Sequence, residues 1–130
     1  MRPAGVFVYG TLKSGERHAR EAEAAGLVRR EPALARGIRL FDLPYGYPAA
    51  VPGEGQVEGE LLVFEDLERA LERLDRFEGD EYQRRVIEVE TPRGRVAAWV
   101  YLYPGAEEAE AVGGTPVPGG VWRGRLPGEP

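Results

Sequence analysis

The sequence has no cysteine, a single histidine (His18) and a single lysine (Lys13). Without cysteine, the chain has no disulfide bond, no thiolate nucleophile and no cysteine-ligated metal. One histidine also makes a His-rich zinc site and a Ser-His-Asp triad poor expectations. Any chemistry must then come from carboxylates, tyrosines and backbone groups, and we expect no metal ion and no other cofactor.

Long apolar runs are also missing, and none approaches the roughly 18 residues that a membrane-spanning helix needs. The first residues show no secretory signal, so we expect a cytoplasmic protein. The formal net charge of −5 makes nucleic acid and anionic membranes poor partners. Sixteen arginines against one lysine, with eleven prolines, resemble the composition of a thermophile, although a biased genome would give the same pattern.

The remaining composition favours one folded domain. The chain has 130 residues, of which 42% are hydrophobic, enough for one real core but not for two. We expect a single domain over residues 1–130, of which about 123–130 form a polar tail. The expected strands and helices do not alternate as a doubly wound parallel sheet requires. We predict an α+β fold in which six or seven strands form a small, mixed and largely closed β-barrel beside two main helices.

Hydrophobic periodicity and turn residues give the individual elements. The expected strands span residues 5–8, 33–41, 49–51, 57–64, 82–91 and 95–103, and the expected helices span 16–25 and 67–78. Gly37 suggests a β-bulge, and residues 52–55 suggest a turn. Thr91-Pro92-Arg93-Gly94 predicts a hairpin. Val121 and Trp122 are expected to anchor the end of the chain.

One carboxylate lies on the apolar side of the second helix. Asp66 is the expected N-cap and Gly79 the expected stop, with Leu67, Leu74 and Phe77 on the core-facing stripe. Glu78 falls near the middle of the same stripe. Burial and the helix C-terminus would both raise the pKa of Glu78 toward neutrality, which suits general acid–base catalysis. The alternative is that the helix frays at Phe77 and Glu78 faces water.

The first strand leads directly into Tyr9-Gly10-Thr11-Leu12. Gly10 can adopt backbone dihedrals that are closed to other residues and lets a ligand approach closely. Successive free N–H groups in such a turn can bind a carboxylate or an oxyanion. A turn with nothing bound is the simpler interpretation of these four residues taken alone.

Three segments together resemble the γ-glutamylcyclotransferase-like family. They are Tyr9-Gly10-Thr11-Leu12 after the first strand, Gly46-Tyr47-Pro48-Ala49, and residues 74–79 (Leu-Asp-Arg-Phe-Glu-Gly) followed by Tyr82-Gln83-Arg84. The resemblance runs from Val6 to Trp122 and is closest to short bacterial members and to γ-glutamylamine cyclotransferase. It implies a small barrel whose cavity holds a γ-glutamyl group.

The resemblance also implies a cofactor-independent enzyme. The α-amine of the substrate would attack its own γ-carbonyl and release 5-oxoproline and a free amine. Glu78 is the implied catalytic general acid/base, and Tyr9, Gly10, Thr11 and Leu12 form the implied substrate-binding loop. Tyr47, Tyr82 and Tyr101 could line the pocket, although plain packing would explain each of them. Arg84 and Arg85 could meet an acidic substrate or simply be exposed strand charges.

Two other functions remain open from the sequence. The first is a non-catalytic module that binds a small carboxylate on the same barrel, and the presence of Glu78 favours the enzyme over it. The second is an oligonucleotide-binding barrel, which would need basic strands with stacking aromatics. The net negative charge argues against that barrel. The family's longer members carry substrate-selecting segments that this chain lacks, so the resemblance does not identify the γ-glutamyl compound.

Overall fold

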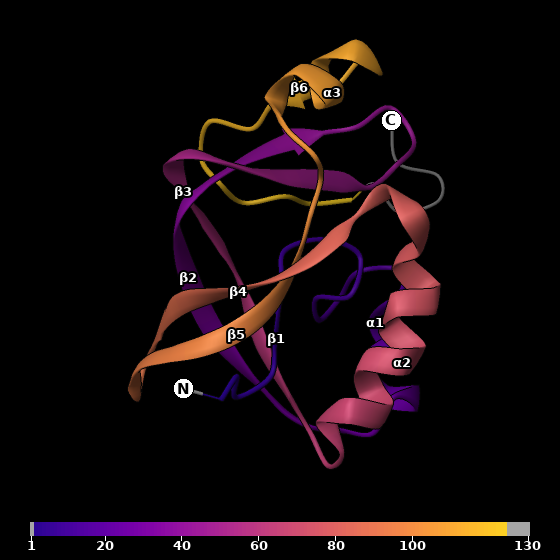
Figure 1. Cartoon of the computed structure of the whole chain (residues 1–130), viewed down its shortest axis with the longest axis vertical. Coiled ribbons are helices and arrows are strands. Elements are labelled where there is room, and N and C mark those ends of the chain that lie inside the picture. The colour runs from indigo at the N-terminus through magenta and orange to yellow at the C-terminus, as the bar shows by residue number, and fades with distance from the viewer. Residues whose placement is uncertain (1, 125–130) are drawn as a thin grey trace.

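The computed structural model describes residues 2–124, which form six strands, three α-helices and one 3-10 turn (Figure 1). In chain order the elements are β1 (Val6–Val8), α1 (Ala19–Ala24), β2 (Leu27–Asp42), β3 (Pro48–Phe64), α2 (Leu67–Glu78), the 3-10 turn η1 (Gly79–Glu81), β4 (Gln83–Thr91), β5 (Gly94–Leu102), α3 (Ala106–Ala111) and β6 (Thr115–Pro116). Most of the expected polar tail, residues 125–130, lies outside the described residues.

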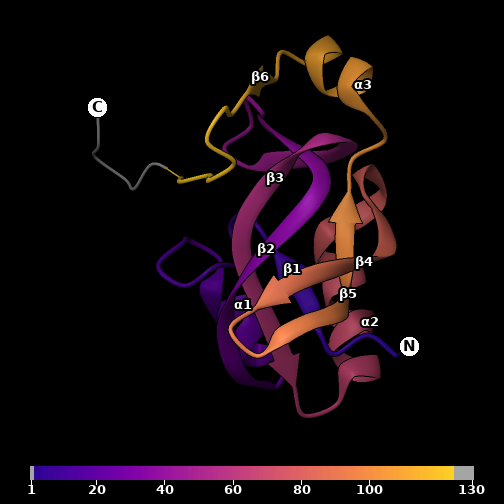
Figure 2. The ribbon, with the colours of Figure 1, turned by 90° about the vertical axis from the view of Figure 1, so that its left-hand side faces the viewer.

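Five strands close into a mixed barrel in the order β3-β1-β5-β4-β2, and β2 returns to pair with β3. The β1–β5 pair is parallel and the other barrel pairs are antiparallel. The sixth strand, β6, adds to β2 at the end of the barrel where α3 also lies (Figures 1 and 2). The predicted α+β class and closed mixed barrel are therefore confirmed. No helix within residues 2–124 has the length and apolar character to cross a membrane.

Strand β1 is apolar throughout because both of its faces are covered. Phe7 packs inside the barrel with residues such as Leu61 and Val100. Val6 and Val8 point the other way and pack with Leu74 of α2 in a second core. A strand buried on both faces reads as a continuous hydrophobic run rather than an alternating one. Figure 1 shows α2 running along one side of the barrel that β1 helps to close.

The expected turn at residues 52–55 is wrong, because β3 continues through it as one strand. The facing strand has the predicted irregularity, a register shift between Arg36 and Ile38 around Gly37, whose φ is +83°. Opposite that bulge, Gly53 and Gly55 have φ values of +154° and +156°, which side-chain-bearing residues rarely adopt. These glycines let a long strand bend around the bulge, so they do not end it.

The helices and the end of the chain differ in detail from the prediction. Helix α1 begins at Ala19 rather than at residue 16, because residues 13–17 form successive turns. Helix α3 and strand β6 were not expected from an acidic and then Gly/Pro-rich segment. The β4–β5 hairpin is confirmed, with Thr91 paired to Gly94. Trp122 is buried and its indole N–H donates to Asp42 (2.8 Å), which confirms the apolar anchor, whereas Val121 is exposed.

Helix α2 has the predicted limits of residues 67–78. The Asp66 carboxylate accepts a hydrogen bond from the Arg69 backbone N–H (3.2 Å), which confirms it as the N-cap. Gly79, with φ of +73°, ends the helix. The prediction was wrong for Phe77, whose side chain is 36% exposed. Because the apolar stripe ends one turn earlier, at Leu74, the last turn of α2 is free to border a cavity.

The β1–β3 seam leaves no room for a side chain at Gly59. A Cβ atom there would lie 2.1 Å from the Val8 carbonyl oxygen and 3.0 Å from the Phe7 ring. We expect Gly59→Ala to lower the free energy of unfolding by about 1–3 kcal/mol, because the two strands must move apart. Urea denaturation measures this change. Gly119→Ala is the control, since its Cβ would have no neighbour within 4 Å, and equal midpoints for the two variants would contradict the close contact.

Candidate active site

A cavity of about 390 Å³ lies where β1, the loop that follows it, and the end of α2 meet. Its walls contain every residue that the sequence assigned to a site: Tyr9, Gly10, Thr11, Leu12, Tyr47, Glu78, Tyr82 and Tyr101. The cavity is also lined by Phe7, Val8, Arg17, His18, Pro48, Phe77, Gly79, Asp80 and Glu81. Segments that are far apart in the sequence therefore line the same cavity.

Glu78 is the last residue of α2 and lies in the cavity wall with its side chain half-buried. Burial raises the pKa of this carboxyl to about 7, and the nearby charge of Glu81 adds to the effect. The charge of Glu78 in turn helps to raise the pKa of Tyr9, Tyr82 and Tyr101, after burial of each of these hydroxyls. A carboxyl with this pKa can both accept and donate a proton near neutral pH.

The loop opposite Glu78 presents unused backbone donors. Among residues 2–124, the N–H groups of Gly10, Thr11 and Leu12 have no hydrogen-bond acceptor. Gly10 is not in the left-handed conformation that the sequence suggested. It is needed instead for close packing, because a Cβ atom would lie 2.7 Å from the ring of Pro48. Three consecutive free amides in a cavity wall are suited to binding an anionic oxygen.

A partly buried ion pair holds this loop in place. The Arg30 guanidinium contacts Glu60 at 2.8 Å and also donates to the Leu12 carbonyl oxygen at 2.9 Å. The same Glu60 oxygen accepts a hydrogen bond from the Ser14 backbone N–H at 2.8 Å, and the other oxygen of the carboxylate accepts one from the Ser14 hydroxyl. Arg30 and Glu60 are diagonal neighbours across the β2–β3 pair, where Arg30 lies opposite Leu62 and Glu60 opposite Pro32, and they tie the loop to the barrel. Sequence reasoning missed this pair, since the two residues are thirty positions apart.

The tyrosine rings line the cavity, but their hydroxyl groups bond to the protein. The Tyr9 hydroxyl donates to the Tyr101 carbonyl oxygen (2.6 Å) and accepts from the Ala50 N–H (3.2 Å). Tyr82 donates to the Pro48 carbonyl (2.7 Å) and Tyr101 to Asp75 (2.7 Å). These hydrogen bonds hold the barrel strands and α2 in place around the cavity. A structural role therefore explains the three tyrosines without a direct part in the chemistry.

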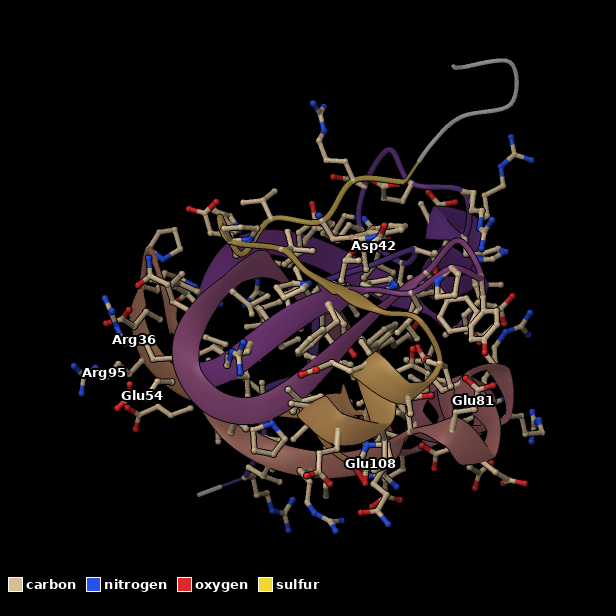
Figure 3. All side chains as sticks on the ribbon, turned by 90° about the horizontal axis from the view of Figure 1, so that it is seen from above. Arg36, Asp42, Glu54, Glu81, Arg95 and Glu108 are labelled. Carbon is tan, nitrogen blue, oxygen red and sulfur yellow. The ribbon has the colours of Figure 1, made fainter. Side chains whose placement is uncertain are left out.

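Tyr47 connects the loop before β3 to η1. Its hydroxyl donates to the Glu81 carboxylate (2.8 Å), and burial followed by this bond raises the pKa of Tyr47 to about 12. Glu81 is exposed and lines the cavity. Figure 3 shows Glu81 on the side of the molecule opposite the exposed Arg36 and Arg95.

The basic residues named from the sequence do not reach the cavity. Arg84 pairs with Asp75 (2.9 Å) and stacks over the Trp99 ring (4.3 Å), and Arg85 is an exposed strand residue. The ammonium of Lys13 donates to the Trp122 carbonyl oxygen, away from the cavity lining. The positive charge in the lining is Arg17, whose guanidinium lies beside Gly46. Arg17 and His18 follow the loop by five and six residues, and that proximity was the only signal that could have found them.

The described residues contain no group of three or more His, Asp or Glu side chains that could hold a metal ion. The groups in the cavity lining that can take part in chemistry are the Glu78 carboxyl, with its near-neutral pKa, the free amides of residues 10–12 and the Arg17 guanidinium.

The ion pair between Arg30 and Glu60, which braces the loop after β1, leads to a first prediction for this site. We expect Glu60→Gln to lower the free energy of unfolding by about 1–2 kcal/mol, because a charge-assisted pair is lost and the Arg30 charge stays partly buried. Both side chains are only 19% exposed. Glu90→Gln, which breaks the exposed pair with Arg36, is the matched control and should cost about 0–1 kcal/mol. Thermal unfolding of both variants measures the difference, and equal losses would contradict the brace.

The raised pKa of Glu78 leads to a second prediction, on how stability changes with pH. Between the ordinary value of 4.5 and about 7, the native state binds the Glu78 proton more tightly than the unfolded state does. The stability that this proton contributes is therefore complete below the ordinary value and is lost as pH rises through about 7. Glu78→Gln has no such group, so its stability relative to wild type should increase from about pH 4 to about pH 8.

Denaturant titrations across that pH range measure the effect. Glu72→Gln, on the exposed face of α2, is the control and should stay parallel to wild type. A stability difference between Glu78→Gln and wild type that does not change with pH would show that the Glu78 carboxyl is not perturbed.

Comparisons with known proteins agree on one family. A sequence model of the family described as gamma-glutamyl cyclotransferase, AIG2-like, matches residues 6–124. The gamma-glutamylcyclotransferase family protein YtfP of Escherichia coli is 36% identical over 100 residues, which cover 75% of this chain and 80% of that protein. Gamma-L-glutamyl-butirosin B gamma-glutamyl cyclotransferase of Niallia circulans is 32% identical over 106 residues, covering 75% of this chain and 65% of that protein.

The fold comparison points the same way. The crystal structure of a mouse AIG2-like protein matches with a TM-score of 0.71 and 25% identity, and the match covers 99% of this chain and 100% of the mouse chain. Sequence and fold thus agree over the barrel, the loop after β1 and the end of α2. The chain belongs to the AIG2-like gamma-glutamylcyclotransferase family.

Proposed function

We propose that this protein is a γ-glutamylcyclotransferase-type enzyme that converts a γ-glutamyl amine or amide to 5-oxoproline and a free amine. The observation that carries the proposal is the placement of Glu78, with its pKa of about 7, in the same cavity as the free amides of Gly10, Thr11 and Leu12. Family membership supports the same reaction class. A cavity of about 390 Å³ suits a small substrate rather than a long peptide.

The reaction needs one group that moves protons. The substrate α-ammonium is unreactive until it loses a proton, and the Glu78 carboxylate accepts that proton. The α-nitrogen then forms a bond to the γ-carbonyl carbon and the carbonyl oxygen becomes an oxyanion. As the bond between that carbon and the amine nitrogen breaks, Glu78 returns the proton to the leaving nitrogen. In total the α-nitrogen loses two protons and the leaving nitrogen gains two. The overall reaction therefore needs no water, oxidant or other co-reactant.

The loop after β1 supplies the electrostatic part. Its free N–H groups would hold either the α-carboxylate of the substrate or the developing oxyanion, and fixed amides do this without reorganisation during the reaction. The Arg30–Glu60 pair keeps the loop in that arrangement. Arg17 lies in the same lining and adds positive charge for an anionic substrate.

These residues do not identify the amine that the reaction releases. The Niallia circulans relative is named for a γ-L-glutamyl compound, gamma-L-glutamyl-butirosin B. We propose that this chain acts on the same γ-glutamyl unit, and that exposed residues at the cavity mouth, such as Asp80 and Glu81, face whatever amine leaves. A panel of γ-glutamyl amines, rather than one compound, is therefore the appropriate test.

We expect the wild type to release 5-oxoproline from at least one member of such a panel, and Glu78→Gln to lose about 10²–10⁴-fold in turnover. Glutamine keeps the shape of the side chain but cannot carry a proton. Chromatographic detection of 5-oxoproline measures the rate, and Glu72→Gln on the exposed face of α2 is the control that should keep full activity.

Two outcomes would contradict the proposal. Normal turnover by Glu78→Gln would remove Glu78 from the mechanism. Binding of 5-oxoproline without turnover of any γ-glutamyl amine would favour the non-catalytic carboxylate-binding module instead.

A further inference from the structure

His18 joins the two sides of the cavity. It is the residue directly before α1, and its backbone N–H donates to the Thr11 carbonyl oxygen (3.0 Å) in the loop after β1. Its ring meets the Phe77 ring edge-on, with centroids 5.2 Å apart, and Phe77 directly precedes Glu78. His18 also lines the cavity. The position of His18 is therefore fixed from both the loop and α2.

The two ring nitrogens of His18 have different surroundings. Nδ1 is enclosed by protein atoms and is the single buried side-chain polar atom without a hydrogen-bond partner in the described part of the chain. Nε2 is not among the enclosed atoms, although no protein group bonds to it within residues 2–124. The ring thus turns one nitrogen into the protein and leaves the other accessible.

This asymmetry selects one protonation state. A proton on Nδ1 would be a buried donor with no acceptor, and such orphan donors are rarer and costlier than an unused lone pair. An imidazolium would carry the same orphan donor together with a buried charge. The favoured form is therefore a neutral ring with its proton on Nε2, the accessible nitrogen.

The charges around the ring are consistent with a neutral imidazole. Burial, followed by the positive charge of Arg17, lowers the pKa of His18, and the carboxylate of Glu21 on α1 acts in the opposite direction. Glu78 lies in the same cavity lining, at the end of α2, but it is not among the charges that shift the pKa of His18.

We propose that His18 is a neutral hydrogen-bond donor that stabilises the oxyanion formed at the γ-carbonyl during cyclisation. The role rests on the proposed function. The Nε2–H group would donate to the oxygen that becomes negative when the α-amine attacks, and it would keep its proton throughout. A neutral donor avoids placing a second cation beside the substrate α-ammonium, and it leaves Glu78 as the group that moves protons.

The protonation state can be measured directly because His18 is the single histidine of the chain. In a tag-free, ¹⁵N-labelled protein, the imidazole nitrogen signals can come from no other residue. We expect a neutral ring at pH 7 with the proton on Nε2, and a shift of the Nε2 signal when 5-oxoproline is added. A proton on Nδ1, or an imidazolium at pH 7, would overturn the proposal. This measurement does not depend on turnover.

Three variants then test the role in the reaction. In His18→Gln the amide nitrogen reaches approximately the position of Nε2, in His18→Asn it reaches only that of Nδ1, and His18→Phe keeps the ring without a donor. We expect His18→Asn and His18→Phe to lose about 10²–10³-fold in kcat, with a smaller change in KM, and His18→Gln to recover at least about tenfold of that loss. Thermal unfolding confirms that all three variants remain folded.

The outcomes separate this role from the proposed function. If the wild type is active and His18→Phe has the same kcat, the role of His18 is overturned but the proposed function is not. Equal losses of kcat in all three variants would also overturn the role of His18, because they would indicate that the residue acts through packing. A wild type that releases no 5-oxoproline from any γ-glutamyl amine would overturn the proposed function and the role of His18 with it.

Discussion

The structure depends on β1 being packed on both faces at once. Three residues close the barrel between β3 and β5 and also supply the surface on which α1 and α2 pack. Because Phe7 faces inward while Val6 and Val8 face the helices, the strand cannot slip by one residue without exposing apolar side chains on one face and overfilling the other. The loop that follows therefore has one position, and the cavity lies where that position meets the end of α2.

The site combines a stability cost with a chemical advantage. A half-buried carboxyl beside Glu81 disfavours its own charge, and the native state carries that cost at neutral pH. The same desolvation brings the pKa of Glu78 to about 7, where a carboxyl is most useful as both acid and base. The free amides of the loop and the accessible Nε2 of His18 are further groups without a protein partner among residues 2–124. Unused hydrogen-bonding groups gathered in one cavity are typical of a binding site.

Much of this arrangement could be read from local sequence patterns. The limits of α2 follow from Asp66 and Gly79, and the hairpin follows from Thr91-Pro92-Arg93-Gly94, because caps and tight turns are determined by a few neighbouring residues. The bulge at Gly37 was visible for the same reason. The sequence also assigned to one site eight residues that the structure places in one cavity wall.

What could not be predicted depends on contacts between distant segments. Gly53 and Gly55 resemble a turn, but the bulge in the facing strand makes them a bend within β3. Gly10 is required by the ring of Pro48, and no local pattern reveals that contact. The Arg30–Glu60 ion pair follows from how β2 and β3 pair, and the guanidinium of Arg17 lies beside Gly46, which is distant in the sequence. In each case the partner, rather than the residue itself, decides the role.

Co-crystallisation with 5-oxoproline tests most directly whether this cavity binds the γ-glutamyl unit beside Glu78. We predict a carboxylate oxygen within hydrogen-bond distance of one or more of the Gly10, Thr11 and Leu12 amides, with the lactam nitrogen or carbonyl facing the Glu78 carboxyl. A ligand bound outside the cavity, or one inside it whose lactam ring is turned away from Glu78, would contradict the proposed arrangement.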